Sequence, residues 1–168
     1  MSLKVLTVAL VTAAGLLSGC GATEPPAKSI ARDSQPTAPP IPVLKVGDPA
    51  AIDLFGDGQA TITVAATELS NLPDGKDRLV VTIDILLNKA GKPIAGGPEN
   101  FRFRDAGKVM YKAQTSEQAF PPELPSVNFT TAGQKAHGRL FFDVPAGSAA
   151  GGHIQLMTGA LVHAVWSV

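Results

Sequence analysis

The 168-residue sequence has little of several features that proteins commonly use, and each shortage narrows what the chain can be. It has a single cysteine, Cys20, so an internal disulfide is impossible and packing alone must hold the fold together. Charged residues make up only 17% of the chain, and 14 basic side chains balance 14 acidic ones. Nucleic acids are bound by clustered lysines and arginines, so this balance argues against a nucleic-acid partner.

The sequence also lacks the spacing of familiar catalytic and metal sites. His137, His153 and His163 stand far apart along the chain, whereas metal ligands on one strand face commonly occupy alternate positions. Ser148 lies among small residues without the Gly-x-Ser-x-Gly elbow of hydrolases. We therefore expect no enzymatic activity, no metal and no cofactor.

The N-terminus of the sequence has the features of an export signal. Lys4 precedes an apolar run over residues 5–17, which is too short to span the roughly 30 Å hydrocarbon core of a bilayer as a permanent helix. The run ends in Leu17-Ser18-Gly19-Cys20. This tetrapeptide resembles the lipobox of bacterial lipoproteins, in which the cysteine thiol is diacylated and the signal is cut off just before it.

The resemblance implies a signal peptide over residues 1–19 and a diacylglyceryl anchor on Cys20. Two acyl chains anchor stably where one is marginal, since each buried CH₂ contributes about 0.8 kcal/mol. The alternative is an ordinary secretory signal with an accidental cysteine. Residues 20–42 contain six prolines and almost no large apolar residue, which is typical of an extended or disordered linker. We therefore expect a lipid-anchored protein on the extracytoplasmic face of the bacterial cell membrane, with residues 20–42 as a tether.

From residue 43 onward, apolar residues recur at alternate positions, as in strands with one buried face. No stretch combines a helical period with caps. The first strand places Ala60, Ile62, Val64 and Ala66 on its buried face, and in the last one His163 is a half-buried strand histidine. The expected strands cover residues 59–67, 79–87, 139–144, 154–157 and 160–166, with a hairpin over 100–113. About seven strands predict an all-β, antiparallel immunoglobulin-like β-sandwich over residues 43–168, without a disulfide.

Several segments resemble the landmarks of a known family. They are Leu87–Pro93, Phe103–Lys108 followed by Tyr111, Gly138–Pro145 and the terminal Val165-Trp166. The family is the immunoglobulin-like domain of unknown function in actinobacterial and other Gram-positive lipoproteins. The C-terminal part is also similar to the small secreted immunogenic β-sandwich protein of mycobacteria, although this chain adds a lipobox. The resemblance implies a β-sandwich and no active site, because the family has no agreed catalytic residues.

Two functions remain open for the domain. The first is contact with a protein or cell-wall partner by a monomeric domain displayed at the membrane. Phe141 faces away from its buried neighbours, so Phe141 and Arg139 together are the candidate contact patch. The alternative for Phe141 is an aromatic ring packed under the loop over residues 115–127. The second function is a carrier that holds a small ligand or lipid between the sheets. An apolar pocket of several hundred Å³ favours the carrier, and a filled core with an exposed Phe141 favours the contact role.

Overall fold

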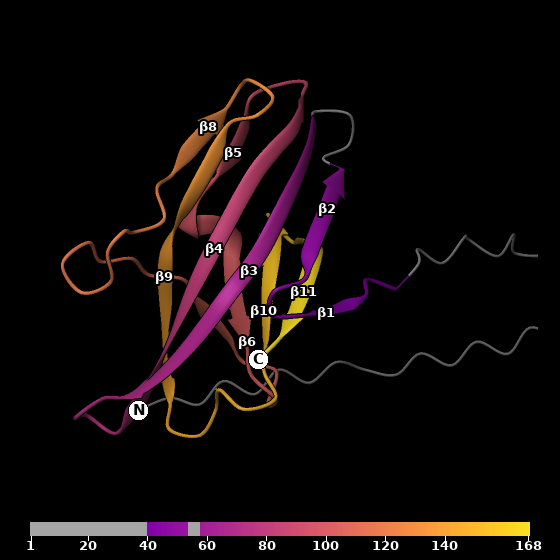
Figure 1. Ribbon diagram of the computed structural model, residues 1–168. Coiled ribbons are helices and arrows are strands. Elements are labelled where there is room, and N and C mark those ends of the chain that lie inside the picture. The colour runs from indigo at the N-terminus through magenta and orange to yellow at the C-terminus, as the bar shows by residue number, and fades with distance from the viewer. Residues whose placement is uncertain (1–39, 54–57) are drawn as a thin grey trace, which may run out of the picture. The chain divides into compact units, whose positions relative to one another are not determined.

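The computed structural model describes residues 40–53 and 58–168, which form a β-sandwich (Figure 1). One sheet has the order β1-β11-β10-β6-β7, a second has the order β2-β3-β4-β9, and a short third sheet pairs β5 with β8. The predicted signal, the lipobox residues Leu17–Cys20 and most of the tether lie outside the described residues. The strands are β1 (Val43–Lys45), β2 (Pro49–Asp53), β3 (Gly58–Asn71), β4 (Lys76–Ala90), β5 (Ile94–Gly96), β6 (Phe101–Arg104), β7 (Met110–Lys112), β8 (Val127–Phe129), β9 (Lys135–Pro145), β10 (His153–Thr158) and β11 (Leu161–Ser167).

The strand order confirms the predicted all-β, immunoglobulin-like class. Immunoglobulin sandwiches place strands A, B and E in one sheet and C, F and G in the other. Here β3, β4 and β9 stand in the first set of positions, and β6, β10 and β11 stand in the second. The helical content of the described ranges is one 3₁₀ turn, η1 (Pro98–Asn100), and no helix there is long and apolar enough to cross a membrane.

β4 is an inner strand of its sheet, and both of its faces are apolar. It pairs antiparallel with β3 on one side and with β9 on the other. Leu79, Val81 and Ile83 are buried on the face toward the β1-β11-β10-β6-β7 sheet, and Val80 on the opposite face is also buried. Continuous apolar sequence is what a strand covered on both faces requires.

The prediction for Ala66 was wrong, because a β-bulge interrupts the alternation in β3. The register runs from Val64↔Ile83 to Ala66↔Thr82, so Ala65 has no opposite residue. One extra residue moves every following side chain to the other face of the sheet. Ala60, Ile62 and Val64 are buried before the bulge, whereas Ala66 after it is exposed.

The core lies between the two large sheets and is built around aromatic rings. Phe103 of β6 and Phe142 of β9 meet across the interior with ring centroids 5.8 Å apart. Trp166 of β11 is 0% exposed, and its Nε1 donates a hydrogen bond to the carbonyl of Asp48 at 2.9 Å. These contacts close the sandwich without a covalent bridge.

The predicted hairpin over 100–113 is confirmed, with one unusual backbone position. β6 and β7 pair antiparallel, and the Lys108 amide donates to the Asp105 carbonyl at 3.0 Å to close the turn. Lys108 itself has a φ of 71°, the left-handed region in which a turn of this kind favours glycine. The Asp105 carboxylate accepts hydrogen bonds from the Val109 amide and the Tyr111 hydroxyl, which hold the turn in place.

Candidate functional site

The structure does not give Phe141 the exposure that the predicted contact patch assumed. Its side chain is only 6% exposed, although it does not belong to the core cluster between the sheets. The Phe120 ring covers it, with centroids 5.4 Å apart, and the Phe141 backbone exchanges two hydrogen bonds with Gln114. Phe141 therefore takes the alternative role, that of an aromatic ring packed beneath the loop that follows β7.

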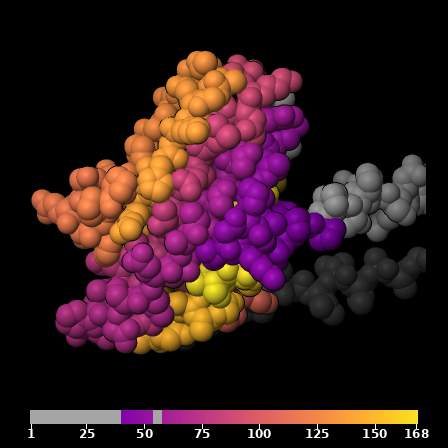
Figure 2. Space-filling model, viewed as in Figure 1, coloured from indigo at the N-terminus to yellow at the C-terminus, as the bar shows by residue number. Residues whose placement is uncertain are grey.

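The segment that covers Phe141 is held in place by charged and backbone contacts. The Arg78 guanidinium stacks 4.3 Å from the centre of the Phe141 ring and forms a two-pronged ion pair with Asp143. The Arg139 amide donates to the Pro122 carbonyl at 2.7 Å, so Arg139 anchors this segment through its backbone. In Figure 2 the segment protrudes in orange beside β9. Arg139 and Phe141 thus fix a loop and do not form an exposed apolar patch.

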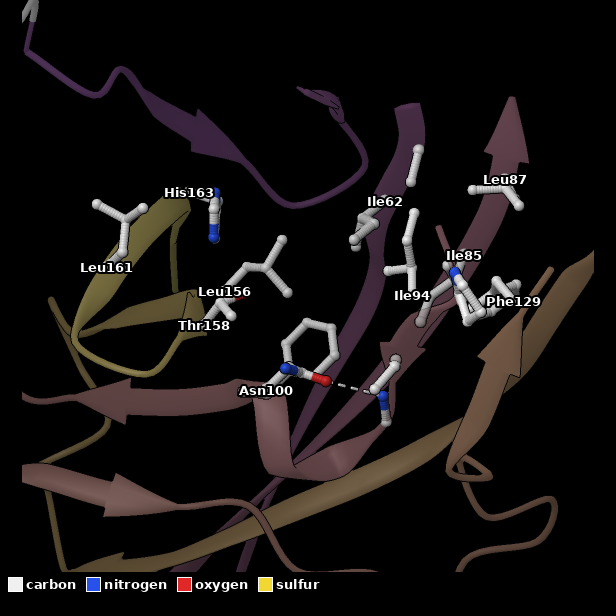
Figure 3. Close-up of a pocket in the computed structure, with 16 residues that line it drawn as sticks. Ile62, Ile85, Leu87, Ile94, Asn100, Phe129, Leu156, Thr158, Leu161 and His163 are labelled. Carbon is white, nitrogen blue, oxygen red and sulfur yellow. Dashed lines mark hydrogen bonds between the residues drawn. The ribbon is translucent and has the colours of Figure 1, made fainter. Parts of the chain in front are cut away.

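An apolar pocket of about 320 Å³ opens between the two large sheets, at the end of the sandwich where β5 and β8 lie (Figure 3). Each of the three sheets supplies one wall. The apolar residues of these walls include Ile62, Ile85 and Leu87 from β3 and β4, Ile94 and Phe129 from β5 and β8, and Phe101, Leu156 and Leu161 from β6, β10 and β11. The volume falls within the range of small-molecule sites, roughly 300–1,000 Å³.

A second β-bulge turns the pocket's polar residue inward. The register of β10 and β11 runs from Leu156↔Ala164 to Met157↔Val162, so His163 is the inserted residue. The bulge reverses the alternation, and both His163 and Leu161 line the pocket instead of the outer face of the sheet. The prediction that His163 is half-buried in a strand is confirmed, but its place in a pocket wall depends on this register shift.

Polar groups are few in the pocket and lie mainly on one side. Asn100 is engaged in the fold, because its carbonyl oxygen accepts from the Gly97 amide at 3.0 Å and its amino group donates to the Met157 carbonyl at 3.2 Å. Burial lowers the pKa of His163 below its ordinary 6.5, which favours the neutral imidazole at pH 7. Thr158 adds a hydroxyl at the rim on the same side as His163 (Figure 3). The arrangement suits a mainly apolar molecule with one polar end.

The pocket holds few groups that could take part in acid–base or metal chemistry. Of the sixteen described residues that line it, His163 alone titrates. The other two histidines are elsewhere: His137 on β9 lies 2.7 Å from the exposed Asp84 carboxylate, and His153 begins β10 opposite Arg104. Within residues 40–53 and 58–168 no three His, Cys, Asp or Glu side chains are placed to hold a metal ion.

Sequence analysis missed the pocket residues, and the reason is geometric. Ile94 lies among glycines and prolines, where an isolated apolar residue gives no periodic signal. Leu161 and His163 face the interior only because of the bulge, which the sequence pattern does not reveal. A large apolar side chain beside Pro93 was the available hint that this turn packs against the core.

Comparisons with known proteins bear on the fold. No family model matches the chain, and no curated protein matches it. A solved secreted protein of Mycobacterium tuberculosis, MPT63, is 18% identical and has a TM-score of 0.62, over 79% of this chain and 100% of that one. The yjhA protein of Bacillus subtilis is 16% identical with a TM-score of 0.52, over 75% of this chain and 99% of that one. The first of these confirms the predicted similarity to a small secreted β-sandwich protein of mycobacteria.

Proposed function

We propose that this chain is a lipid-anchored extracytoplasmic protein whose β-sandwich binds a small apolar ligand between its sheets. The observation that carries this proposal is the apolar pocket of about 320 Å³, open at one end of the sandwich. The competing contact role needs an exposed aromatic patch, and Phe141 is buried. We assign the domain a binding role and no catalytic one, since the pocket offers a single titratable side chain.

The proposed location is supported by two separate features. Leu17-Ser18-Gly19-Cys20 has the order of a lipobox, and the similar M. tuberculosis structure is that of a secreted protein. If Cys20 carries the anchor, Cys20→Ala should move the protein out of the membrane fraction and abolish incorporation of labelled fatty acid. A Cys20→Ala protein that has lost its signal peptide yet stays in the membrane fraction would exclude the lipid anchor.

The size of the pocket limits the ligand. A methylene group occupies about the volume of a water molecule, roughly 30 Å³, so the pocket holds about ten carbon atoms. Burying ten methylene groups contributes at most about 8 kcal/mol, at about 0.8 kcal/mol each. That upper limit corresponds to a dissociation constant of about 1 μM. We therefore expect micromolar or weaker binding of medium-length alkyl chains.

A pocket-filling substitution tests this assignment. Leu161 of β11 lines the pocket and is 47% exposed, so Leu161→Trp can narrow the opening without overpacking the core. We expect it to weaken binding of a fluorescent medium-chain fatty acid at least tenfold. The matched control is Leu69→Trp on β3, an exposed leucine outside the pocket, which should bind like the unaltered protein. Equal binding by all three proteins, or none by the unaltered one, would refute the assignment.

A further inference from the structure

The pocket opens to solvent at the first residues of β11. Leu161 lines the pocket and is nevertheless 47% exposed, so the interior reaches solvent at this residue. His163 and Thr158 flank the same opening (Figure 3). We call this opening, at Thr158, Leu161 and His163, the pocket mouth.

The N-terminal segment joins the domain on the side of the pocket mouth. β1 pairs with β11 in parallel, with Val43 opposite Val165 and Lys45 opposite Ser167. In a parallel pair, residues before Val43 lead toward the residues before Val165, which are those of the pocket mouth. In Figure 3 the indigo ribbon of β1 accordingly passes on the same side of the pocket as Leu161 and His163.

Exposed apolar side chains accompany this junction. Ile41 is 41% exposed and Val43 is 57% exposed, and both belong to the segment that leads into β1 along β11. Together with Leu161 they account for three of the six large hydrophobic side chains exposed within the described ranges. The other three, Leu69, Val109 and Met110, lie on β3 and at the β6–β7 turn. We call Ile41, Val43 and Leu161 the apolar rim.

We propose that the pocket mouth faces the membrane and receives one acyl chain of a bilayer lipid, methyl end first, with the polar end of the lipid held beside His163 and Thr158. This inference rests on the proposed function and deepens it by naming the ligand class and its route. An acyl chain that passes from the bilayer across an apolar rim into an apolar pocket avoids contact with water. The near-neutral charge of the chain fits a zwitterionic or neutral lipid, since it offers no polybasic patch for anionic headgroups.

The tether explains why the mouth would be the end nearest the bilayer. About twenty residues separate Cys20 from the first described residue, Pro40. The described chain enters the domain through Ile41 and β1, which pairs with β11, so we expect an anchor at Cys20 to keep this side of the domain toward the bilayer. The apolar rim would then contact the membrane surface directly.

Substitutions in the rim separate uptake from binding. Neither Ile41 nor Val43 lines the pocket, so the double variant Ile41→Asp, Val43→Asp should bind a soluble medium-chain fatty acid like the unaltered protein. Its uptake of a labelled phosphatidylcholine from vesicles of the same lipid should be at least tenfold slower. Leu69→Asp is the matched control, because Leu69 is also exposed (55%) but lies on β3, away from the pocket. All measurements use the full membrane-extracted chain, with melting temperatures recorded alongside.

Each outcome decides a different part of the proposal. Equal uptake by the double variant and Leu69→Asp would refute the membrane-facing mouth while leaving the pocket assignment intact. Failure of the unaltered chain to bind soluble fatty acid would refute the proposed function itself. Should the double variant melt early, Ile41→Asp alone, which precedes β1, provides the same comparison. Uptake by Cys20→Ala but not by the lipidated chain would refute the bilayer source and identify the protein's own anchor as the occupant.

Discussion

Replacing Trp166 by alanine should remove a large part of the stability of the domain. The indole is 0% exposed on the inner face of β11 and is the largest fully buried side chain among the described residues. Its Nε1 also donates to the Asp48 carbonyl at 2.9 Å, which fastens the turn between β1 and β2 to the core. The substitution therefore leaves a cavity in the core and also removes the hydrogen bond that holds the turn between β1 and β2.

The expected loss follows from the cavity and the hydrogen bond. Truncating a fully buried aromatic side chain to alanine costs about 3–5 kcal/mol. The hydrogen bond adds about 1 kcal/mol, and Trp166→Phe should reveal that part alone, since it keeps most of the buried ring. Domains of this size are stable by roughly 5–15 kcal/mol, so Trp166→Ala should leave a marginal fold.

Urea unfolding followed by far-ultraviolet circular dichroism is the suitable assay, because the substitution removes the single tryptophan of the chain. With a slope of about 2 kcal/mol per molar urea, a 4 kcal/mol loss lowers the midpoint by about 2 M. Val165→Ala, a half-buried neighbour, is the control and should lose far less. A loss below 1 kcal/mol for Trp166→Ala would show that the ring does not support the core.

Three further predictions concern other parts of the fold. Burial lowers the pKa of His163 in the folded protein, so the unfolded chain binds a proton on this side chain more readily. The free energy of unfolding should therefore fall as the pH drops below about 6.5. His163→Gln should flatten this part of a plot of urea midpoint against pH. Lys108→Gly should raise stability by about 1 kcal/mol in thermal unfolding, since it relieves a left-handed backbone, and an unchanged melting temperature would argue against strain there. Gly138→Ala should destabilise by about 1–3 kcal/mol, because its Cβ would lie 2.5 Å from the backbone of Glu123 and Leu124; a neutral effect would mean that this segment yields freely.

The fold class could be predicted because most strands have apolar residues at alternate positions of the sequence. Phe101 and Phe103 alternate with arginines, and the structure buries both rings. The short strands β1, β2, β5 and β8 escaped prediction, since three to five residues give too few repeats for a period to be visible. Their pairing is decided by tertiary contacts, as between Ile94 and Phe129.

The candidate site was harder to predict than the fold, for two physical reasons. Insertion of single residues at Ala65 and His163 reverses the faces of β3 and β11, and nothing in the local pattern marks the insertion. Phe141 occupies an outward position by alternation, and Phe120 and Arg78, both distant from it in the sequence, cover it. Periodicity assigns a face to a side chain but does not tell what covers that face.

The parallel pairing of β1 with β11 also has a mechanical meaning. A pull on the chain ahead of Val43 acts along the strand direction, so the backbone hydrogen bonds of the three paired positions are loaded together in shear. A strand pulled at right angles to its neighbour would instead lose its bonds one after another. A force applied from the N-terminal side therefore loads several β1–β11 hydrogen bonds at once. The force is distributed along β11 before it reaches the core.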